Sequence, residues 1–392
     1  MTRLGPLVAG RTKLALVAGA VLWLLWAATA VLGRGNLDRN GQVIGTDHTA
    51  FQTAAVLIAD GRGDALYDYP ALPVFARTQE EITGKPGFVD PYRNPPFYAL
   101  LYRPTARLPY LASYGLWAVV GLFVLVGGLR LLAGADWRRS VGWALCFYPV
   151  FAAVSFGQNT LLSFGVFALV HAAVVRRQLF LAGLAAGLLA YKPQLLFGLV
   201  IWWTLDVRTY WRAWLGMMVT GTVLAAISFA VVPAETQAWV TNLPAIARYD
   251  AFEFYNLHTL RGFGQLLTGD KTVGNIAGFV GMGLGVGAFV LFRRRVTDPA
   301  LLSAAAVYVT LWASPHTMTY EWGLAILPAA VVWAVRPDLR HEWVPLFAIA
   351  WAAFFVSTPL TKAQLDAVGL GVQLSVPVMA YVGVRAGQLV AR

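Results

Sequence analysis

The sequence predicts an all-α integral membrane protein: a polytopic bundle of about twelve transmembrane helices, with interfacial amphipathic helices in a long first external loop. Two observations carry this prediction. Of the 392 residues, 58% are hydrophobic and only 12% are charged, and the mean hydropathy of +0.62 is well above that of soluble domains. Apolar stretches long enough to form membrane helices also recur along the chain.

We expect helices near residues 13–32, 111–133, 140–154, 160–175, 179–191, 194–206, 212–232, 273–292, 299–313, 322–335, 343–357 and 370–390. The first stretch lacks an Ala-x-Ala-like cleavage site, so we expect a retained transmembrane helix rather than a signal peptide. Lys192 and Pro193 interrupt residues 179–206, which form either one kinked helix or two half-spans.

Basic residues predict the topology, because Lys and Arg gather in cytoplasmic loops. They occur here in every second loop: Arg3, Arg11 and Lys13; Arg130, Arg138 and Arg139; Arg176 and Arg177; Arg208 and Arg212; Arg293 to Arg295; Arg336 and Arg340; Arg385 and Arg392. Both termini are therefore predicted to be cytoplasmic, and this alternation favours two half-spans around Lys192. The net charge of +11 does not indicate nucleic acid, because the cations do not follow one face.

We expect one transmembrane domain over residues 1–392, with long external loops at 33–110 and 233–272. Shorter segments predicted on the same face are 155–159 (SFGQN), 191–194 (YKPQ), 314–322 (SPHTMTYEW) and 357–366 (STPLTKAQLD). Nearly all the unusual polar residues lie in these segments. The sequence therefore predicts a functional site on that face.

Asp47 follows the first apolar stretch and precedes apolar residues at helical spacing, which predicts a short amphipathic helix on the membrane face. Thr46 or Asp47 would begin this helix, and the Gly61-Arg62-Gly63 segment would end it. Asp47 is either an N-cap that accepts backbone hydrogen bonds or a functional carboxylate.

Two cations in the external segments are candidates for an anion site. Lys192, beside Tyr191, either snorkels towards water or holds an anion, because an ammonium is costly in hydrocarbon. His316, five residues before Glu321, either binds a phosphate when protonated or hydrogen-bonds the chain.

The segment 252–267 places His258 and Arg261 among aromatic and glycine residues. This composition suits a grip on a phosphate and a sugar ring, but it also suits an interfacial segment anchored by aromatic side chains.

Amides and a proline-rich turn add candidates for sugar contacts. Gln158 and Asn159 can bind sugar hydroxyls or cap the helix that follows. Arg93 and Asn94 lie in a rigid turn before two prolines, where Arg93 either orients Asp47 or a substrate or is simply exposed.

Several classes of function are disfavoured. The sequence has no Walker A loop, no H-E-x-x-H, no G-x-S-x-G and no paired His or Cys at metal-binding spacing. A nucleotide-driven pump and a membrane metalloprotease are therefore not expected. The single cysteine, Cys146, cannot form a disulfide within one chain and is expected to be a small core residue.

Five motifs in order resemble glycosyltransferase family 87, within the GT-C superfamily of membrane glycosyltransferases, and together they cover essentially the whole chain. They are GTDHTAFQTAAVLIADGRGDALYD, YRNPPFYALLYRPTARLPYLASYGLW, SFGQNTLL, GLLAYKPQLL and ASPHTMTYEWGLAILP. This sequence departs from the family's common pattern at His48, which directly follows Asp47, and at Thr317 to Thr319.

The resemblance implies an inverting transferase in the bacterial cytoplasmic membrane, with its active site facing the periplasm or exterior. It would move a hexose, typically mannose, from a polyprenyl-phosphate donor to a glycolipid or glycan, without a metal or other cofactor. Asp47 is implied as general base, with Lys192 and His316 near the donor phosphate and Arg261 and His258 as further ligands. Candidates for sugar or acceptor contact are Thr46, His48, Arg93, Asn94, Gln158, Asn159, Tyr191 and Glu321.

A polytopic transporter or lipid-linked sugar flippase is the alternative from another class. Transporters usually show repeat symmetry and charges near the bilayer midplane, whereas the charges here cluster at one face. A non-catalytic scaffold leaves the one-sided set of polar residues unexplained.

Overall fold

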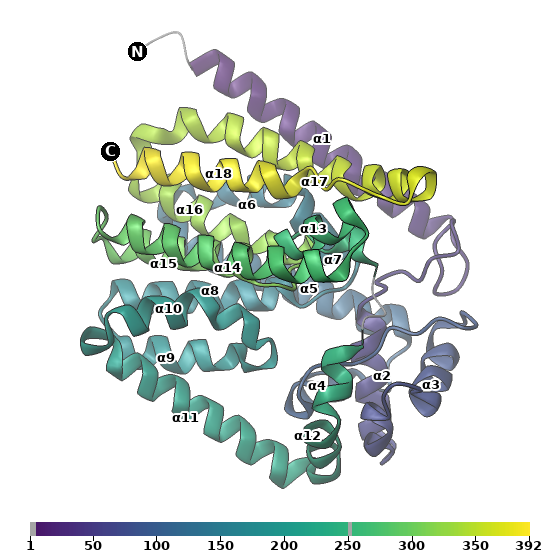
Figure 1. Ribbon diagram of the computed structural model, residues 1–392. Coiled ribbons are helices and arrows are strands. Elements are labelled where there is room, and N and C mark those ends of the chain that lie inside the picture. The colour runs from purple at the N-terminus through teal and green to yellow at the C-terminus, as the bar shows by residue number, and fades with distance from the viewer. Residues whose placement is uncertain (1–4, 250–252) are drawn as a thin grey trace.

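The computed structural model describes residues 5–249 and 253–392, with side chains from Leu16 onward. In this part of the chain the regular secondary structure is helical, and β-structure is limited to isolated bridges (Figure 1). Arg3, the side chains of Arg11 and Lys13, and the start of the aromatic segment at Phe252 lie outside the described residues. Four helical stretches within it are long and apolar enough to cross a membrane: Tyr110–Cys146, Val207–Val231, Lys271–Arg293 and Pro337–Val368. Shorter apolar helices accompany them, so the chain is an all-helical, multi-pass membrane protein.

The observed helices follow the predicted apolar stretches closely. They are α1 (Gly5–Val31), α5 (Tyr110–Ala133), α6 (Trp137–Cys146), α7 (Tyr148–Ser155), α8 (Thr160–Val175), α9 (Leu179–Gly187), α10 (Phe197–Leu205), α11 (Val207–Val231), α14 (Lys271–Arg293), α15 (Pro299–Ala313), α16 (Ile326–Val335), α17 (Arg340–Val368) and α18 (Ser375–Val390). The predicted helix 140–154 is broken, because Phe147 is extended (ψ 120°) ahead of Pro149.

The segment around Lys192 forms two helices rather than one kinked helix. Short 3-10 turns at Leu188–Tyr191 and Pro193–Leu196 flank Lys192, whose backbone is not helical. α9 and α11 run parallel, because their contacts advance in the same direction along both helices. Gly183 lies against Ala213, where a Cβ would come within 1.9 Å of the Ala213 oxygen, and Gly187 lies against Thr220, where a Cβ would come within 2.5 Å of Thr220 Cβ. α10, which joins them, therefore runs back in the opposite direction.

Arginine side chains tie the helix ends together at one end of the bundle. Arg293 donates to the Leu205 oxygen at 3.0 Å, and Arg336 donates to the Val390 oxygen at 3.0 Å. Arg340 pairs with Asp136 at 2.6 Å. Figure 1 shows the start of α1 and the end of α18 at this end, which we call the basic end, with α2 to α4 at the opposite end.

The long loops fold into helices at the opposite end: α2 (His48–Ala59), α3 (Pro73–Thr83), α4 (Pro96–Tyr102), α12 (Pro233–Arg248) and α13 (Leu260–Thr268). The predicted amphipathic helix after Asp47 is α2, but it does not lie on the membrane face. Ten of its twelve residues are buried, because α3, α4 and the turns around them pack against it. The predicted loop 357–366 is also helical, since α17 continues to Val368 through Pro359.

Candidate active site

Asp47 occupies the N-cap position of α2 but does not cap it. Its backbone is helical (φ −80°, ψ −17°), and its side chain accepts no hydrogen bond from the first turn of α2. The Asp47 N–H donates to the Phe156 oxygen at 2.8 Å, while one carboxylate oxygen accepts from Gln158 Nε2 at 2.7 Å. The capping alternative is therefore wrong, and the carboxylate is directed towards the SFGQN segment.

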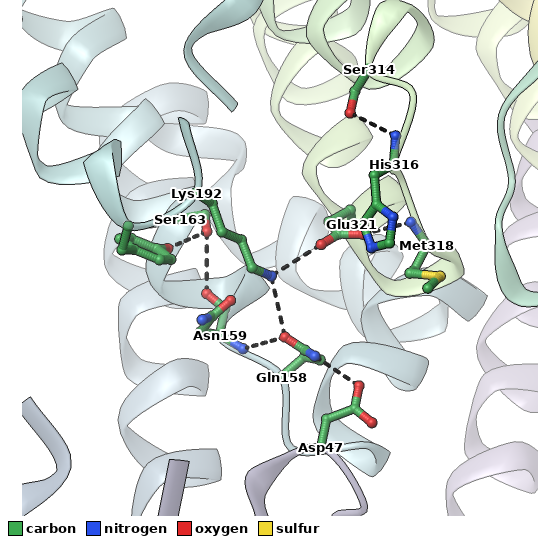
Figure 2. Close-up of polar contacts among 10 residues, drawn as sticks. Asp47, Gln158, Asn159, Ser163, Lys192, Ser314, His316, Met318 and Glu321 are labelled. Carbon is green, nitrogen blue, oxygen red and sulfur yellow. Dashed lines mark hydrogen bonds and ion pairs between the residues drawn. The ribbon is translucent and has the colours of Figure 1, made fainter. Parts of the chain in front are cut away.

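A chain of polar contacts continues from Asp47 across three other segments (Figure 2). Lys192 Nζ donates to Gln158 Oε1 at 3.3 Å and forms an ion pair with Glu321 Oε1 at 3.0 Å. The second Glu321 oxygen accepts from the Met318 N–H at 2.6 Å. We call Asp47, Gln158, Lys192 and Glu321 the polar chain; its members come from four of the predicted external segments.

The Lys192 and Glu321 side chains are only 11% and 5% exposed. Lys192 therefore does not snorkel to water; it is held by an anion, and that anion is Glu321. A buried ion pair is stabilised only while both partners remain, because removal of one leaves an uncompensated charge. The Tyr320 ring, with its centroid 5.7 Å from Lys192 Nζ, lies over the same cation.

Burial raises the pKa of Asp47 from 3.8 to about 6. The hydrogen bond from Gln158, the charge of Lys192 and the Tyr320 hydroxyl lower this pKa, whereas the charge of Glu321 raises it. Asp47 is therefore ionised at neutral pH, yet it is a stronger base than an exposed aspartate. A carboxylate of this kind can accept a proton from a hydroxyl, and the adjacent buried cation can stabilise an anion.

Asp90 is a second carboxylate at this site, and sequence reasoning missed it. The Gln79 side chain accepts from the Asp90 backbone N–H at 2.6 Å and donates to the Asp90 backbone oxygen at 3.0 Å. The same amide nitrogen also donates to Thr49 Oγ1 at 2.9 Å, which ties Asp90 to the first turn of α2. Burial, and then the negative charge of Asp47, raise the pKa of Asp90, while Arg93 lowers it. One acid before a proline turn has no distinguishing pattern in a single sequence.

Arg93 and Asn94 lie in the turn next to Asp90. The Arg93 guanidinium lies 5.4 Å from the centroid of the Tyr249 ring and hydrogen-bonds Tyr69, so it is not a simply exposed arginine. The Asn94 backbone oxygen accepts from the Tyr67 hydroxyl at 2.6 Å, which fixes the turn.

Asn159 and Tyr191 border the polar chain. Asn159 is the N-cap residue of α8, but its side chain makes no capping bond, and both of its amide atoms are buried without a partner within the described chain. The capping alternative for this segment is therefore wrong. The Tyr191 hydroxyl is 2.6 Å from Ser163 Oγ, and the Tyr191 ring stacks on Tyr98 with centroids 4.0 Å apart.

Thr46 and His48 flank Asp47 but bond elsewhere. Thr46 Oγ1 donates to the Val43 oxygen at 2.9 Å. His48 is buried among aromatic rings with Nε2 3.0 Å from Ser113 Oγ, and burial lowers its pKa to about 3. His48 is therefore a neutral, packed side chain.

His258 lies in a separate buried cluster. Its ring nitrogens contact Ser375 Oγ at 2.5 Å and Thr358 Oγ1 at 3.1 Å, and burial lowers its pKa to about 3. Its backbone N–H donates to the Thr317 oxygen at 2.9 Å. A neutral imidazole with both nitrogens engaged is poorly placed to bind a phosphate; this residue instead anchors the segment that carries His316 and Glu321.

The remaining predicted cations are placed as follows. Arg261, on α13, donates to Asn275 Oδ1 of α14 at 3.1 Å, and its guanidinium lies 5.6 Å from the Phe254 ring centroid. His316 is partly buried on the same short segment as Met318 and Glu321, and its backbone N–H donates to Ser314 Oγ at 3.2 Å (Figure 2). Among the described residues, no group of three or more His, Cys, Asp or Glu side chains is placed to hold a metal.

The model of glycosyltransferase family 87 matches residues 92–315, more than half of the chain. The matched region contains Arg93, Gln158, Lys192 and Arg261, whereas Asp47, His316 and Glu321 lie outside it. Comparisons with curated proteins and with solved structures gave no match. The chain belongs to glycosyltransferase family 87 and is a membrane glycosyltransferase of the kind that uses lipid-linked sugars.

Proposed function

We propose that this enzyme transfers a hexose, mannose in the first instance, from a polyprenyl-phosphate donor to a hydroxyl of a glycolipid or glycan. The bundle is a GT-C-type single domain of about twelve spans, and the reaction takes place on the outer face of a bacterial cytoplasmic membrane. One observation carries the proposal: the polar chain connects a carboxylate of raised pKa to a buried lysine within a few hydrogen bonds.

The reaction is a direct displacement. Asp47 accepts the proton of the acceptor hydroxyl as its oxygen attacks the anomeric carbon, and the bond from that carbon to the phosphate oxygen breaks. Attack from the face opposite the leaving group inverts the anomeric configuration. A phosphomonoester leaves as a stable anion, so no second group has to protonate it.

Lys192 stabilises the leaving phosphate. In the structure it is paired with Glu321, and a donor phosphate has to share or replace this partner. His316, on the Glu321 segment, and Arg261 act as further donors, while the polyprenyl chain lies between helices. His258 is left out of this set, because both of its ring nitrogens are engaged within the protein.

On the acceptor side, Asp90, Arg93 and the Gln158 amide bind hydroxyl groups next to the attacking oxygen. Burial and the negative charge of Asp47 raise the pKa of Asp90, which favours a protonated carboxyl that can donate a hydrogen bond. Tyr191 and Asn159 shape the same region, and Gln158 holds the Asp47 carboxylate in position.

The direct test is to incubate the purified protein with polyprenyl-phosphate mannose and a membrane-lipid extract. The expected result is an acceptor species heavier by one hexose, with loss of donor in equal amount. Consumption of donor without a glycosylated product, or transbilayer movement of the donor without transfer, would instead support hydrolysis or flipping.

The proposed orientation places residues 33–110, 233–272 and 314–322 outside the cytoplasm, because the arginine-tied helix ends lie at the other end of the bundle. A single Cys replacing Thr268, which is exposed, in a Cys146→Ala background should react with an impermeant maleimide added from outside intact cells. Labelling that requires disruption of the membrane would reverse the topology.

The raised pKa of Asp47 predicts the pH dependence of the reaction. Because the base has to be ionised, kcat/KM should be level above the pKa of about 6 and fall roughly tenfold per pH unit below it. A pH-rate profile measured at acceptor concentrations well below KM, with saturating donor, checks this. A profile that stays level down to pH 4.5 would show that Asp47 does not titrate with a raised pKa.

A further inference from the structure

A cavity of about 860 Å³ lies among α6, α14, α15, α16, α17 and α18, and its walls are mostly apolar. Its lining on α15 extends from Leu301, near the start of the helix, to Trp312, near its end, a rise of about 17 Å along the helix axis. The Leu301 end of the cavity lies at the basic end, whereas the end of α15 leads towards His316 and Glu321.

Two arginines at the Leu301 end of the cavity lack acidic partners within the described chain. Arg294 and Arg295 line the cavity and are exposed, and no carboxylate of the described chain pairs with either of them. The neighbouring arginines are engaged: Arg293 with the Leu205 oxygen, Arg336 with Asp338, Arg340 with Asp136 and Arg385 with Glu342. The Leu301 end of the cavity therefore carries two exposed guanidinium groups that no carboxylate of the described chain neutralises.

Three tryptophans near the same end add hydrogen-bond donors. Trp143, Trp333 and Trp343 line the cavity, and each indole N–H is buried without a partner among the described residues. Tryptophan is typical of the level where acyl chains meet headgroups, and its N–H usually finds an acceptor when buried. Ester carbonyls of a lipid would supply acceptors at this level.

We propose that this cavity binds one phospholipid with an anionic headgroup, taken from the leaflet at the basic end. The acyl chains occupy the apolar part, and Arg294 and Arg295 hold the phosphate. We assign the cavity to a phospholipid rather than to the sugar donor, because the charged residues among its described lining, Arg294 and Arg295, lie at the end away from Lys192 and His316. This lipid site is independent of the proposed reaction.

Native mass spectrometry of the full-length protein tests the proposal, with phosphatidylglycerol and phosphatidylcholine of equal chain length offered separately. The wild type should retain one phosphatidylglycerol at least about tenfold more strongly than phosphatidylcholine. The R294Q/R295Q variant should lose this preference. The matched control R208Q/R212Q removes the same charge from two exposed arginines at the basic end that do not line the cavity, and it should keep the preference.

A second variant tests the apolar part. Ala329 lines the cavity and is only partly buried, so Ala329→Phe should fill the space and lower retention of both lipids while the arginines remain. Equal retention of the two lipids by the wild type, or equal loss of preference in both double variants, would overturn the proposal. Displacement of phosphatidylglycerol by polyprenyl phosphate would assign the cavity to the donor instead.

Discussion

Replacing Asp47 by Asn is expected to lower turnover by about 10²–10⁴-fold while the protein stays folded. The amide has nearly the same shape, and the structure shows no capping bond that it would lose. It cannot accept the proton of the acceptor hydroxyl, so the chemical step slows while donor binding persists. Steady-state kinetics with saturating donor, together with a thermal melt, check both parts of this expectation.

Asp90→Asn is the matched control, because it makes the same change at the neighbouring carboxylate. Burial and the charge of Asp47 raise the pKa of Asp90, and an amide there keeps the shape of a protonated carboxyl and its ability to donate a hydrogen bond. Turnover should then fall by less than about tenfold. If Asp47→Asn transferred sugar at the wild-type rate, or Asp90→Asn caused the larger loss, the assignment of Asp47 as base would be wrong.

Removing the Lys192 cation is expected to cost about 10²–10³-fold in kcat/KM for the donor. Lys192→Ala alone is a poor test, because it leaves Glu321 buried without its partner and so threatens the fold. The double variant Lys192→Met, Glu321→Gln removes both charges together and should remain folded. Donor kinetics at fixed acceptor measure the loss.

Glu321→Gln alone keeps the lysine and removes the anion that competes with the donor phosphate. Its donor KM should therefore be unchanged or lower, in contrast to the double variant. Because Glu321→Gln also leaves Lys192 buried without its charged partner, its kinetics are compared only if its thermal melt matches that of the wild type. Lys192→Arg should retain part of the activity if charge alone is required, and less if a compact ammonium is needed at that point. Wild-type donor kinetics in the neutral double variant would remove Lys192 from the donor site.

The sequence by itself determined the membrane class, most helix positions and the grouping of polar residues in alternate loops. These properties depend on local composition: a membrane helix needs a continuous apolar stretch, and basic residues mark one set of loops. An interruption at Lys192 was also visible, and the alternation of basic loops favoured two half-spans there over one kinked helix. Candidate residues such as Asp47 and Lys192 could be named, but two interpretations of each remained open.

Only the tertiary structure decided between those interpretations, because each depends on contacts between residues far apart in the chain. Gln158 lies 111 positions from Asp47, and Glu321 lies 129 positions from Lys192; their contacts exclude the capping aspartate and the snorkelling lysine. The burial of α2 depends on α3 and α4 packing over it, which its own apolar spacing does not reveal. Asp90 likewise becomes a candidate only when Gln79 ties it to α2, since a lone carboxylate acquires its chemistry from its neighbours.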